Sequence, residues 1–274
     1  MTTVANLTTG RSSDPDRRRD ARILLAHVLG RPSPAALDPS REVSVPEESA
    51  FAALWARYEA GEPVQYILGE WDFYGRTFRV DARALIPRPE TEHLVEEALR
   101  DAPSPRRILD LGCGSGILAV TLACERPAAL VVGIDRSPAA LALARDNVRR
   151  HRVGDRAVLA ASDWLGALGA ARFDLAVSNP PYVAADGRGA LPPSVRDFEP
   201  PEALFAGADG LSEIRRLLDS VPRVLVPGGL FFFEIGFGQA EAVRREASLR
   251  PEWDVRRIVP DLAGIPRVVA LARR

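Results

Sequence analysis

The strongest constraint on the fold is a regular alternation of short apolar runs and helical segments, which begins near Arg107 and continues to the end of the chain. Apolar runs separated by helices are typical of strands in a parallel sheet that is covered on both faces. The pattern predicts an α/β domain with a doubly wound, mostly parallel, seven-stranded sheet. It leaves open an antiparallel hairpin at the sheet edge. The runs are Ile108–Leu111, Leu130–Ile134, Ala157–Ala161, Leu175–Val177, Val224–Val226, Leu230–Ile235 and Val268–Leu271.

The first 70 residues have helical periodicity instead. A short amphipathic helix is predicted over residues 16–29 and is ended by Gly30 and Pro32. A second helix begins near Ser44, whose spacing to Glu47 is that of a capping box. Apolar side chains then recur at helical spacing, which indicates core packing rather than a ligand site. They are Phe51, Leu54, Trp55 and Tyr58.

Residues 73–80 alternate around Gly75, and this pattern predicts a β-hairpin between the helical part and the α/β part. Four parts are therefore expected along the chain. Residues 1–15 form a flexible tail, residues 16–70 a helical domain, residues 71–86 a linking hairpin and residues 87–274 the α/β domain.

Composition and charge exclude several classes of protein. The formal net charge is −1, so no basic excess indicates direct nucleic-acid binding. All the cationic side chains are arginines, which we interpret as a property of composition rather than of function. The most apolar stretch, residues 221–237, is interrupted by Arg223, Pro227 and Glu234, so no membrane segment is expected.

The numbers and positions of cysteine and histidine bear on the compartment and on metal binding. Cys113 and Cys124 are too few for a disulfide framework, which favours a reducing compartment. The three histidines lack the spacing of zinc ligands, so no metal site is predicted. The first 20 residues are polar and lack the apolar core of a secretory signal. We expect a soluble, monomeric, cytoplasmic protein.

A glycine-rich turn follows the first apolar run of the α/β domain and leads into a helix. It consists of Gly112, Cys113, Gly114, Ser115 and Gly116. Glycines allow a tight turn and the close approach of a ligand. This Gly-x-Gly-x-Gly spacing differs from the Gly-x-Gly-x-x-Gly of dinucleotide binders.

Acidic and aromatic side chains follow the next two runs. Asp135, at the end of the second run, is placed to accept hydrogen bonds from ribose hydroxyls. Asp163 and Trp164 follow the third run and are candidates for binding an adenine ring, by hydrogen bonding and by stacking. A structural Asp-Trp turn is the alternative. The set resembles the S-adenosylmethionine site of class I methyltransferases, and NAD binding is the second possibility.

The fourth run leads directly into Asn179, Pro180, Pro181 and Tyr182. The prolines hold an extended turn and leave backbone carbonyls without a competing N–H. Asn179 Oδ1 and the Pro180 carbonyl can both accept hydrogen bonds from a target –NH₂ group, which would orient a weakly nucleophilic nitrogen. Tyr182 can pack on a planar substrate group. A turn that only ends the strand is the structural alternative.

The chain resembles the bacterial release-factor glutamine methyltransferases from about Ala21 to Leu271. The Asn-Pro-Pro-Tyr segment is shared with other amino-group methyltransferases, whereas the segment Ile86–Thr91 and the helical N-terminal part are more specific. Further matching segments are Pro63–Gly69, Phe73–Gly75, Leu85–Glu92, Asp110–Gly116, Glu199–Pro200, Asp209–Leu211, Pro227–Gly229, Glu234–Gly236 and Asp261–Gly264.

The resemblance implies a reaction and a site. It implies transfer of a methyl group from S-adenosylmethionine to the glutamine side chain in the Gly-Gly-Gln motif of release factors, with S-adenosylhomocysteine as product. The helical domain would recognise the substrate, which would dock between the two domains. The glycine turn, Asp135, Asp163, Trp164 and Asn179 would contact the cofactor. Residues 179–182 would hold the glutamine, together with Arg88 and Glu90, which could equally form a structural pair. Residues 87–91 would line the same cleft.

Three alternative functions stay open at this point. The first is methylation of a glutamine in a ribosomal protein. The second is methylation of an amino group on a nucleic-acid base, which the near-zero net charge disfavours. The third is binding of S-adenosylmethionine without catalysis, which the complete Asn-Pro-Pro-Tyr segment disfavours.

Overall fold

The computed structural model describes residues 2–10, 13–169 and 172–274, and the chain divides into two compact units. One unit holds the residues up to Glu70 together with Pro193–Phe198, and the other holds Trp71–Pro192 together with Glu199–Arg274. The sequence placed Pro193–Phe198 in the main domain. The structure groups this segment with the helical unit, where the Phe198 ring lies 3.4 Å from the position of a Cβ on Gly61.

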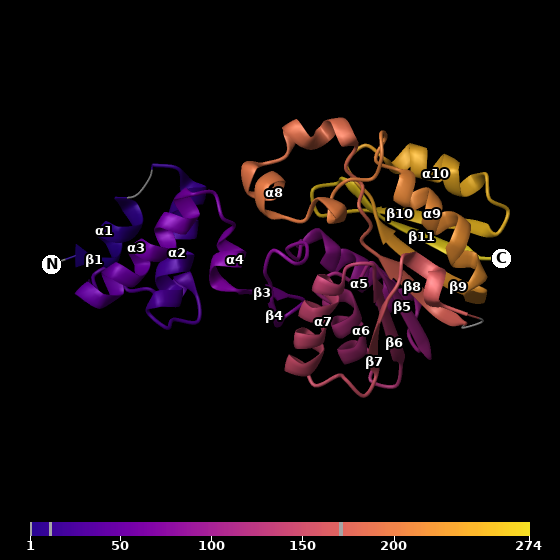
Figure 1. Ribbon diagram of the computed structural model, residues 1–274, viewed down its shortest axis with the longest axis horizontal. Helices are drawn as coiled ribbons and strands as arrows, with labels where there is room; N and C mark the ends of the chain where they lie inside the picture. Colours follow the sequence, from indigo (N-terminus) through magenta and orange to yellow (C-terminus); the bar gives the residue numbers. More distant parts are fainter. Residues whose placement is uncertain (1, 11–12, 170–171) are drawn as a thin grey trace. The chain divides into compact units, whose positions relative to one another are not determined.

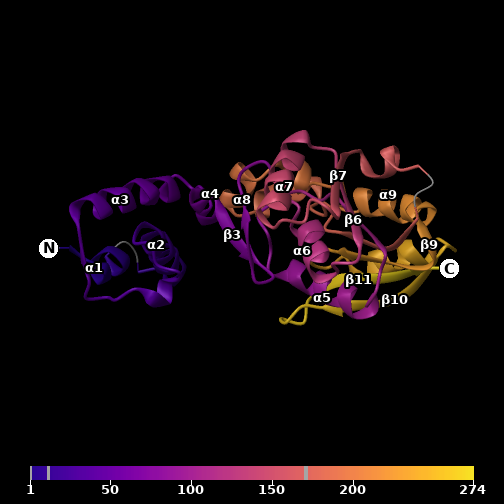
Figure 2. The ribbon, with the colours of Figure 1, turned by 90° about the horizontal axis from the view of Figure 1, so that it is seen from below.

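The first unit is built on two helices that lie side by side, α2 (Pro15–Val28) and α3 (Val45–Glu59) (Figures 1 and 2). Both predicted helices are confirmed. The predicted capping box is present at the start of α3, where the Ser44 N–H donates to Glu47 Oε2 at 2.9 Å. Phe51 and Trp55 are buried, and the Tyr58 hydroxyl donates to Asp20 Oδ2 at 2.9 Å, which joins the two helices.

The beginning of the chain differs from the predicted flexible tail. Residues Thr2–Thr3 form strand β1, which pairs antiparallel with β2 (Glu42–Val43), and Val4–Thr9 form helix α1. Val4 and Leu7 are buried because they fall three residues apart on one helical face. Two apolar residues in a largely polar stretch are too short a pattern to predict a helix. Met1, Arg11 and Ser12 of the predicted tail lie outside the described residues. The unit is completed by the 3₁₀ turn Pro34–Ala36, α4 (Val64–Leu68) and α8 (Pro193–Phe198).

A two-stranded hairpin, β3 (Glu70–Phe73) and β4 (Arg76–Arg79), comes next along the chain. Tyr74 and Gly75 form its loop with φ angles of 51° and 68°. Positive φ at both loop positions is characteristic of a type I′ turn, whose twist matches that of the strands. The predicted hairpin is confirmed, with its first strand starting a few residues earlier than expected.

The second unit contains the predicted seven-stranded sheet, whose strand order is β10-β11-β9-β8-β5-β6-β7 (Figure 1). The pairs from β9 to β7 are parallel, whereas β11 pairs antiparallel with both β9 and β10. The antiparallel edge that the sequence left open is therefore present. The strands are β5 (Arg107–Leu111), β6 (Leu130–Asp135), β7 (Ala157–Ala161), β8 (Phe173–Ser178), β9 (Leu225–Glu234), β10 (Trp253–Pro260) and β11 (Pro266–Arg273).

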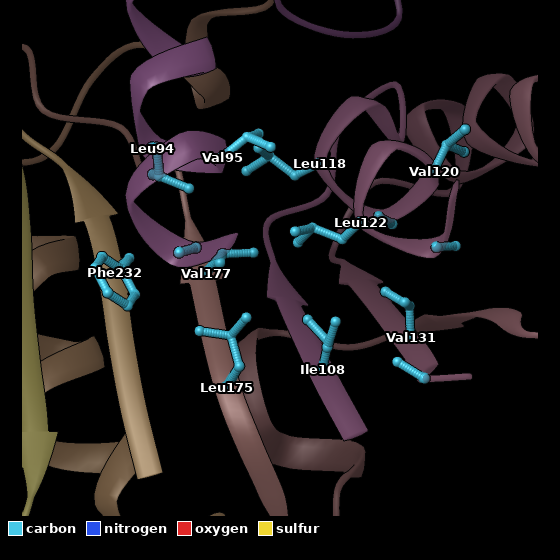
Figure 3. Close-up of a cluster of buried hydrophobic side chains, with 14 of the residues drawn as sticks. Leu94, Val95, Ile108, Leu118, Val120, Leu122, Val131, Leu175, Val177 and Phe232 are labelled. Carbon is cyan, nitrogen blue, oxygen red and sulfur yellow. The ribbon is translucent and has the colours of Figure 1, made fainter. Parts of the chain in front are cut away.

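Helices cover both faces of this sheet. On one face, α5 (Glu90–Asp101), α6 (Ile117–Glu125) and α7 (Pro138–Arg150) contribute side chains to a core with Ile108, Leu175 and Phe232, part of which is drawn in Figure 3. On the other face, α9 (Ser212–Ser220) and α10 (Ala240–Ser248) pack on Phe231 and Phe233. Side chains of one strand alternate between the two cores, as the pleat requires.

Two predictions about the strands are corrected by the structure. The runs Val224–Val226 and Leu230–Ile235 are one continuous strand, because Pro227-Gly228-Gly229 forms a bulge in β9 and the strand does not end there. Strand β10 was missed, because Asp254, Arg256 and Arg257 interrupt its apolar pattern at the open edge of the sheet. In the part of the chain that the structure describes, no helix has the length and apolar character needed to cross a bilayer.

Candidate active site

An open pocket lies at the carboxyl ends of the parallel strands β5, β6 and β8, where α/β sheets bind ligands. Its empty volume, including the mouth, is about 1000 Å³. All of its lining residues belong to the second unit. Among the predicted site residues, the pocket is lined by Arg88, Gly112, Cys113, Gly114, Ser115, Asp135, Asp163, Trp164, Asn179 and Pro181. The other predicted site residues, Glu90, Gly116, Pro180 and Tyr182, are not among the described residues that line it.

The glycine turn joins β5 to α6 and forms the floor of the pocket. Gly112 has a φ of 70°, so the turn favours glycine there, and a Cβ at this position would be in ordinary contact with the Trp164 ring, at 3.4 Å. The turn is held from behind by buried Asn147 of α7, whose Nδ2 donates to the Ser115 carbonyl at 2.8 Å. Burial raises the pKa of the Cys113 thiol, which therefore stays protonated.

Asp135, the last residue of β6, is fixed by two backbone groups. Its Oδ2 accepts from the Gly114 N–H at 2.8 Å, and its Oδ1 accepts from the Ser137 N–H at 2.8 Å. A carboxylate has about four lone-pair positions, so each oxygen retains capacity for a further donor. The structure thus orients a carboxylate beside the glycine turn, at the position that the sequence predicted for a ribose.

Trp164 and Asp163 have protein partners that the sequence did not predict. The Trp164 indole lines the pocket, and its Nε1 donates to Glu213 Oε2 at 2.6 Å. The Asp163 carboxylate forms an ion pair with Arg216 at 2.7 Å. Arg216 also pairs with Glu213, so α9 holds this loop through both residues. Trp164 is therefore placed to stack on a planar ligand, whereas the predicted role of Asp163 in adenine binding competes with its ion pair.

The Asn-Pro-Pro-Tyr segment follows β8 directly. The Asn179 Nδ2 group donates to Thr91 Oγ1 at 3.1 Å, which leaves Oδ1 as the acceptor that a substrate can use. The Tyr182 hydroxyl donates to Glu234 Oε1 at 3.1 Å, and burial together with the Glu234 carboxylate raises the pKa of this phenol. Gln239 Nε2 donates to the Tyr182 carbonyl at 3.0 Å and fixes the end of the segment.

Arg88 has a different partner from the one considered in the sequence. Its guanidinium donates to Glu199 Oε1 at 2.6 Å, and Glu199 is 2% exposed. Burial raises the pKa of Glu199, although Arg88 opposes the shift. The structural pair is therefore Arg88–Glu199 and not Arg88–Glu90. Because Arg88 also lines the pocket, this ion pair holds a guanidinium at its wall.

The structure brings most of the predicted residues together and adds three that the sequence missed as parts of the site. Glu213, Glu199 and Glu234 contact predicted residues through hydrogen bonds, and Thr91, which the sequence placed along the cleft, accepts a hydrogen bond from Asn179. Each of these hydrogen bonds joins residues far apart in the sequence, so no local sequence motif could identify it. Within the described residues, no group of three or more side chains is arranged to bind a metal ion.

Comparisons with known proteins identify both parts of the chain. Residues 90–190 match the model of the methyltransferase small domain, and residues 9–69 match that of the PrmC N-terminal domain. A solved methyltransferase from Pyrococcus furiosus superposes with a TM-score of 0.56 at 15% identity, covering 81% of this chain and 98% of that one, so the likeness concerns the fold.

Two curated relatives are similar over nearly the whole chain. The release factor glutamine methyltransferase of Cereibacter sphaeroides is 45% identical over 261 residues, which cover 92% of this chain and 90% of the relative. The one from Bordetella pertussis is 44% identical, covering 92% and 93%. Identity at this level over both the helical part and the catalytic part means that the chain belongs to the family of release factor glutamine methyltransferases.

Proposed function

We infer that the chain methylates the side-chain amide of the glutamine in the Gly-Gly-Gln motif of peptide-chain release factors, with S-adenosylmethionine as methyl donor. The family assignment supports this substrate, and one observation in the site carries the chemistry. Asn179 lines the pocket with its Nδ2 bound to Thr91, so that its Oδ1 is available to a substrate amide.

The residues of the pocket fit S-adenosylmethionine. The glycine turn presents its backbone to the pocket, and the fixed carboxylate of Asp135 retains lone pairs for ribose hydroxyls. When bound, S-adenosylmethionine would supply an electrophilic methyl group to the glutamine nitrogen, with S-adenosylhomocysteine as the leaving group and a proton lost from the nitrogen to solvent.

The Asn-Pro-Pro-Tyr residues prepare the glutamine nitrogen for this reaction. An amide nitrogen is a weak nucleophile because its lone pair is delocalised into the carbonyl group. Oδ1 of Asn179, which lines the pocket, accepts a hydrogen bond from the –NH₂ group, and we propose that the carbonyl of Pro180, which lies between the lining residues Asn179 and Pro181, accepts a second one. Both bonds strengthen as positive charge develops on nitrogen. We further propose that the protein acts as a cytoplasmic monomer.

Labelling of a purified release factor tests the substrate. With S-adenosylmethionine carrying a labelled methyl group, we expect label on the release factor and none on its Gln→Ala variant, because the acceptor nitrogen is missing. Equal labelling of both would overturn the assignment. Ribosomes and total nucleic acid serve as competing substrates in the same assay, and preferential label on either would assign the enzyme to that substrate instead.

The carboxylate of Asp135 is expected to contribute to cofactor binding. Asp135→Ala should raise the Kd for S-adenosylmethionine at least about tenfold, because the two charge-assisted hydrogen bonds proposed between the ribose hydroxyls and the carboxylate are lost. Isothermal titration calorimetry measures this change. Asp155→Ala is the matched control, because the Asp155 side chain is 73% exposed and pairs with the neighbouring Arg156. A Kd equal to that of the control would remove Asp135 from the site.

A further inference from the structure

A buried carboxylate lies behind the Asn-Pro-Pro-Tyr segment. Glu234 ends strand β9 and is 1% exposed. The parallel register pairs Ser178 of β8 with Phe233 of β9, so Asn179 and Glu234 are the next residues on two neighbouring strands. The sheet therefore brings this acidic side chain to the same edge as the segment that faces the pocket.

Glu234 is connected to both ends of that segment. Its Oε2 accepts from the Thr91 hydroxyl at 2.6 Å, and its Oε1 accepts from the Tyr182 hydroxyl at 3.1 Å. Thr91 lies in the first turn of α5, is fully buried, and accepts from Asn179 Nδ2 at 3.1 Å. A single carboxylate thus restrains the amide and the phenol at the same time.

The direction of these hydrogen bonds follows from the proton inventory. A threonine hydroxyl has one proton, and when Glu234 is ionised Thr91 gives that proton to the carboxylate, which then has none to give. Thr91 Oγ1 can then only accept, so the –NH₂ end of Asn179 must face it. The carbonyl end of Asn179 is turned away from Thr91 as a consequence.

We propose that Thr91 and Glu234 are positioning residues for methyl transfer, and that the hydrogen-bonded chain Glu234–Thr91–Asn179 holds Asn179 Oδ1 toward the substrate amide. This proposal rests on the proposed function. Successive hydrogen bonds in one direction polarise one another, so the buried carboxylate also increases the negative charge on Oδ1. That charge stabilises the positive charge developing on the glutamine nitrogen, although Glu234 itself does not line the pocket.

The charges around Glu234 set the pH range in which the hydrogen-bonded chain Glu234–Thr91–Asn179 is intact. Burial raises the pKa of Glu234, whereas the hydrogen bonds from Thr91 and Tyr182 and the charge of Arg267 lower it, and Glu90 raises it. Protonation would make Glu234 a donor on one oxygen, so it could no longer accept from both hydroxyls. Activity is therefore expected to fall as the pH decreases through the pKa of this carboxyl.

Thr91→Val and Thr91→Ser separate the hydroxyl from the packing. Thr91→Val keeps the shape but removes the acceptor for Asn179, so we expect kcat for release-factor methylation to fall about tenfold, as for the loss of one aligned hydrogen bond. Thr91→Ser keeps the hydroxyl and should retain kcat within about threefold of the wild type. The Kd for S-adenosylmethionine and the KM for the release factor should change less than kcat in both variants.

Thr121→Val is the matched control for a buried threonine. Thr121 is fully buried in α6, and its hydroxyl has no hydrogen-bond partner among the described residues. This variant should keep the wild-type kcat. Equal values for Thr91→Val and Thr91→Ser, either both high or both low, would overturn the proposal. Wild-type enzyme that fails to label the release factor would instead overturn the proposed function, so the two failures are distinguishable.

Glu234→Gln tests the charge of the carboxyl rather than its shape. The amide has nearly the same volume and can still accept from Thr91, but it does not titrate. We expect kcat to fall, and the acidic limb of the kcat–pH profile to move to lower pH than in the wild type. A limb with an unchanged midpoint would contradict the role of the carboxylate, and thermal unfolding confirms that the variant is folded.

Discussion

Asn179→Ala is expected to lower kcat for release-factor methylation on the order of a hundredfold. The variant removes an acceptor that strengthens only as positive charge develops on the glutamine nitrogen, and the loss of one such preorganised group costs roughly 10²–10³ in rate in comparable sites. The fold should persist, because Thr91 retains its hydrogen bond to Glu234 when the amide is removed. Single-turnover kinetics with saturating S-adenosylmethionine and release factor measures the chemical step directly.

The control for this variant is Asn6→Ala in the helical unit. The Asn6 side chain is exposed, and the hydrogen bond of this residue to Thr3 uses its backbone N–H, which alanine retains. The control should have the wild-type kcat and melting temperature. A wild-type-like kcat in Asn179→Ala would refute the mechanism, whereas a large fall in melting temperature would show that the loss of rate has a structural cause.

The fold could be predicted where local patterns determine it. The central parallel strands are buried on both faces, so they are mostly apolar and easily identified, even though Asp110 lies in β5. Strand β10 escaped prediction because it lies at the sheet edge, where alternating charges such as Asp254 and Arg256 are tolerated. Helix α1 escaped because its stability depends on Val4 and Leu7 meeting the rest of the unit, and not on the helix propensity of the segment.

The site, like the fold, could be predicted where contiguous sequence motifs determine it. Glycine turns, Asp135 and the Asn-Pro-Pro-Tyr segment are contiguous signals that sit next to predicted strand ends. The hydrogen bond between Thr91 and Glu234 joins residues 143 positions apart, and that between Trp164 and Glu213 joins residues 49 apart. Such pairs depend on the order of the strands and on the packing of α5 and α9, which no local pattern encodes. The hydrogen bonds that orient the reactive side chains therefore emerged only from the structure.

Asp110, in the strand that leads to the glycine turn, is a buried carboxyl group that makes stability depend on pH. It is fully buried one residue before the end of β5, and its Oδ2 accepts from the Ala119 N–H at 2.9 Å. Its Oδ1 has no hydrogen-bond partner among the residues that the structure describes. Burial raises the pKa of Asp110 to about 8, the Ala119 hydrogen bond opposes this shift, and the charge of Asp135 adds to it. The folded enzyme therefore holds this carboxyl protonated at neutral pH.

A raised pKa in the folded state has a definite consequence for stability. In the unfolded chain Asp110 ionises near its ordinary pKa of about 4, so between about pH 4 and pH 8 the folded state binds one more proton than the unfolded state. The contribution of Asp110 is fully present below that range and is lost as the pH rises through it, by up to about 1.4 kcal/mol per pH unit. The free energy of unfolding of the wild type therefore decreases by this amount as the pH rises.

Asp110→Asn is expected to remove that pH dependence. The amide copies the shape of the protonated carboxyl and never ionises, so the variant should gain stability over the wild type as the pH rises from 5.5 to 7.5. Urea unfolding of the wild type and the variant at several pH values measures the difference, and Asp155→Asn at the exposed position provides the control. All other titrating groups are common to wild type and variant, so the difference between their stability curves isolates Asp110. Parallel curves would mean that Asp110 is ionised in the folded enzyme, with a charge compensated inside the core.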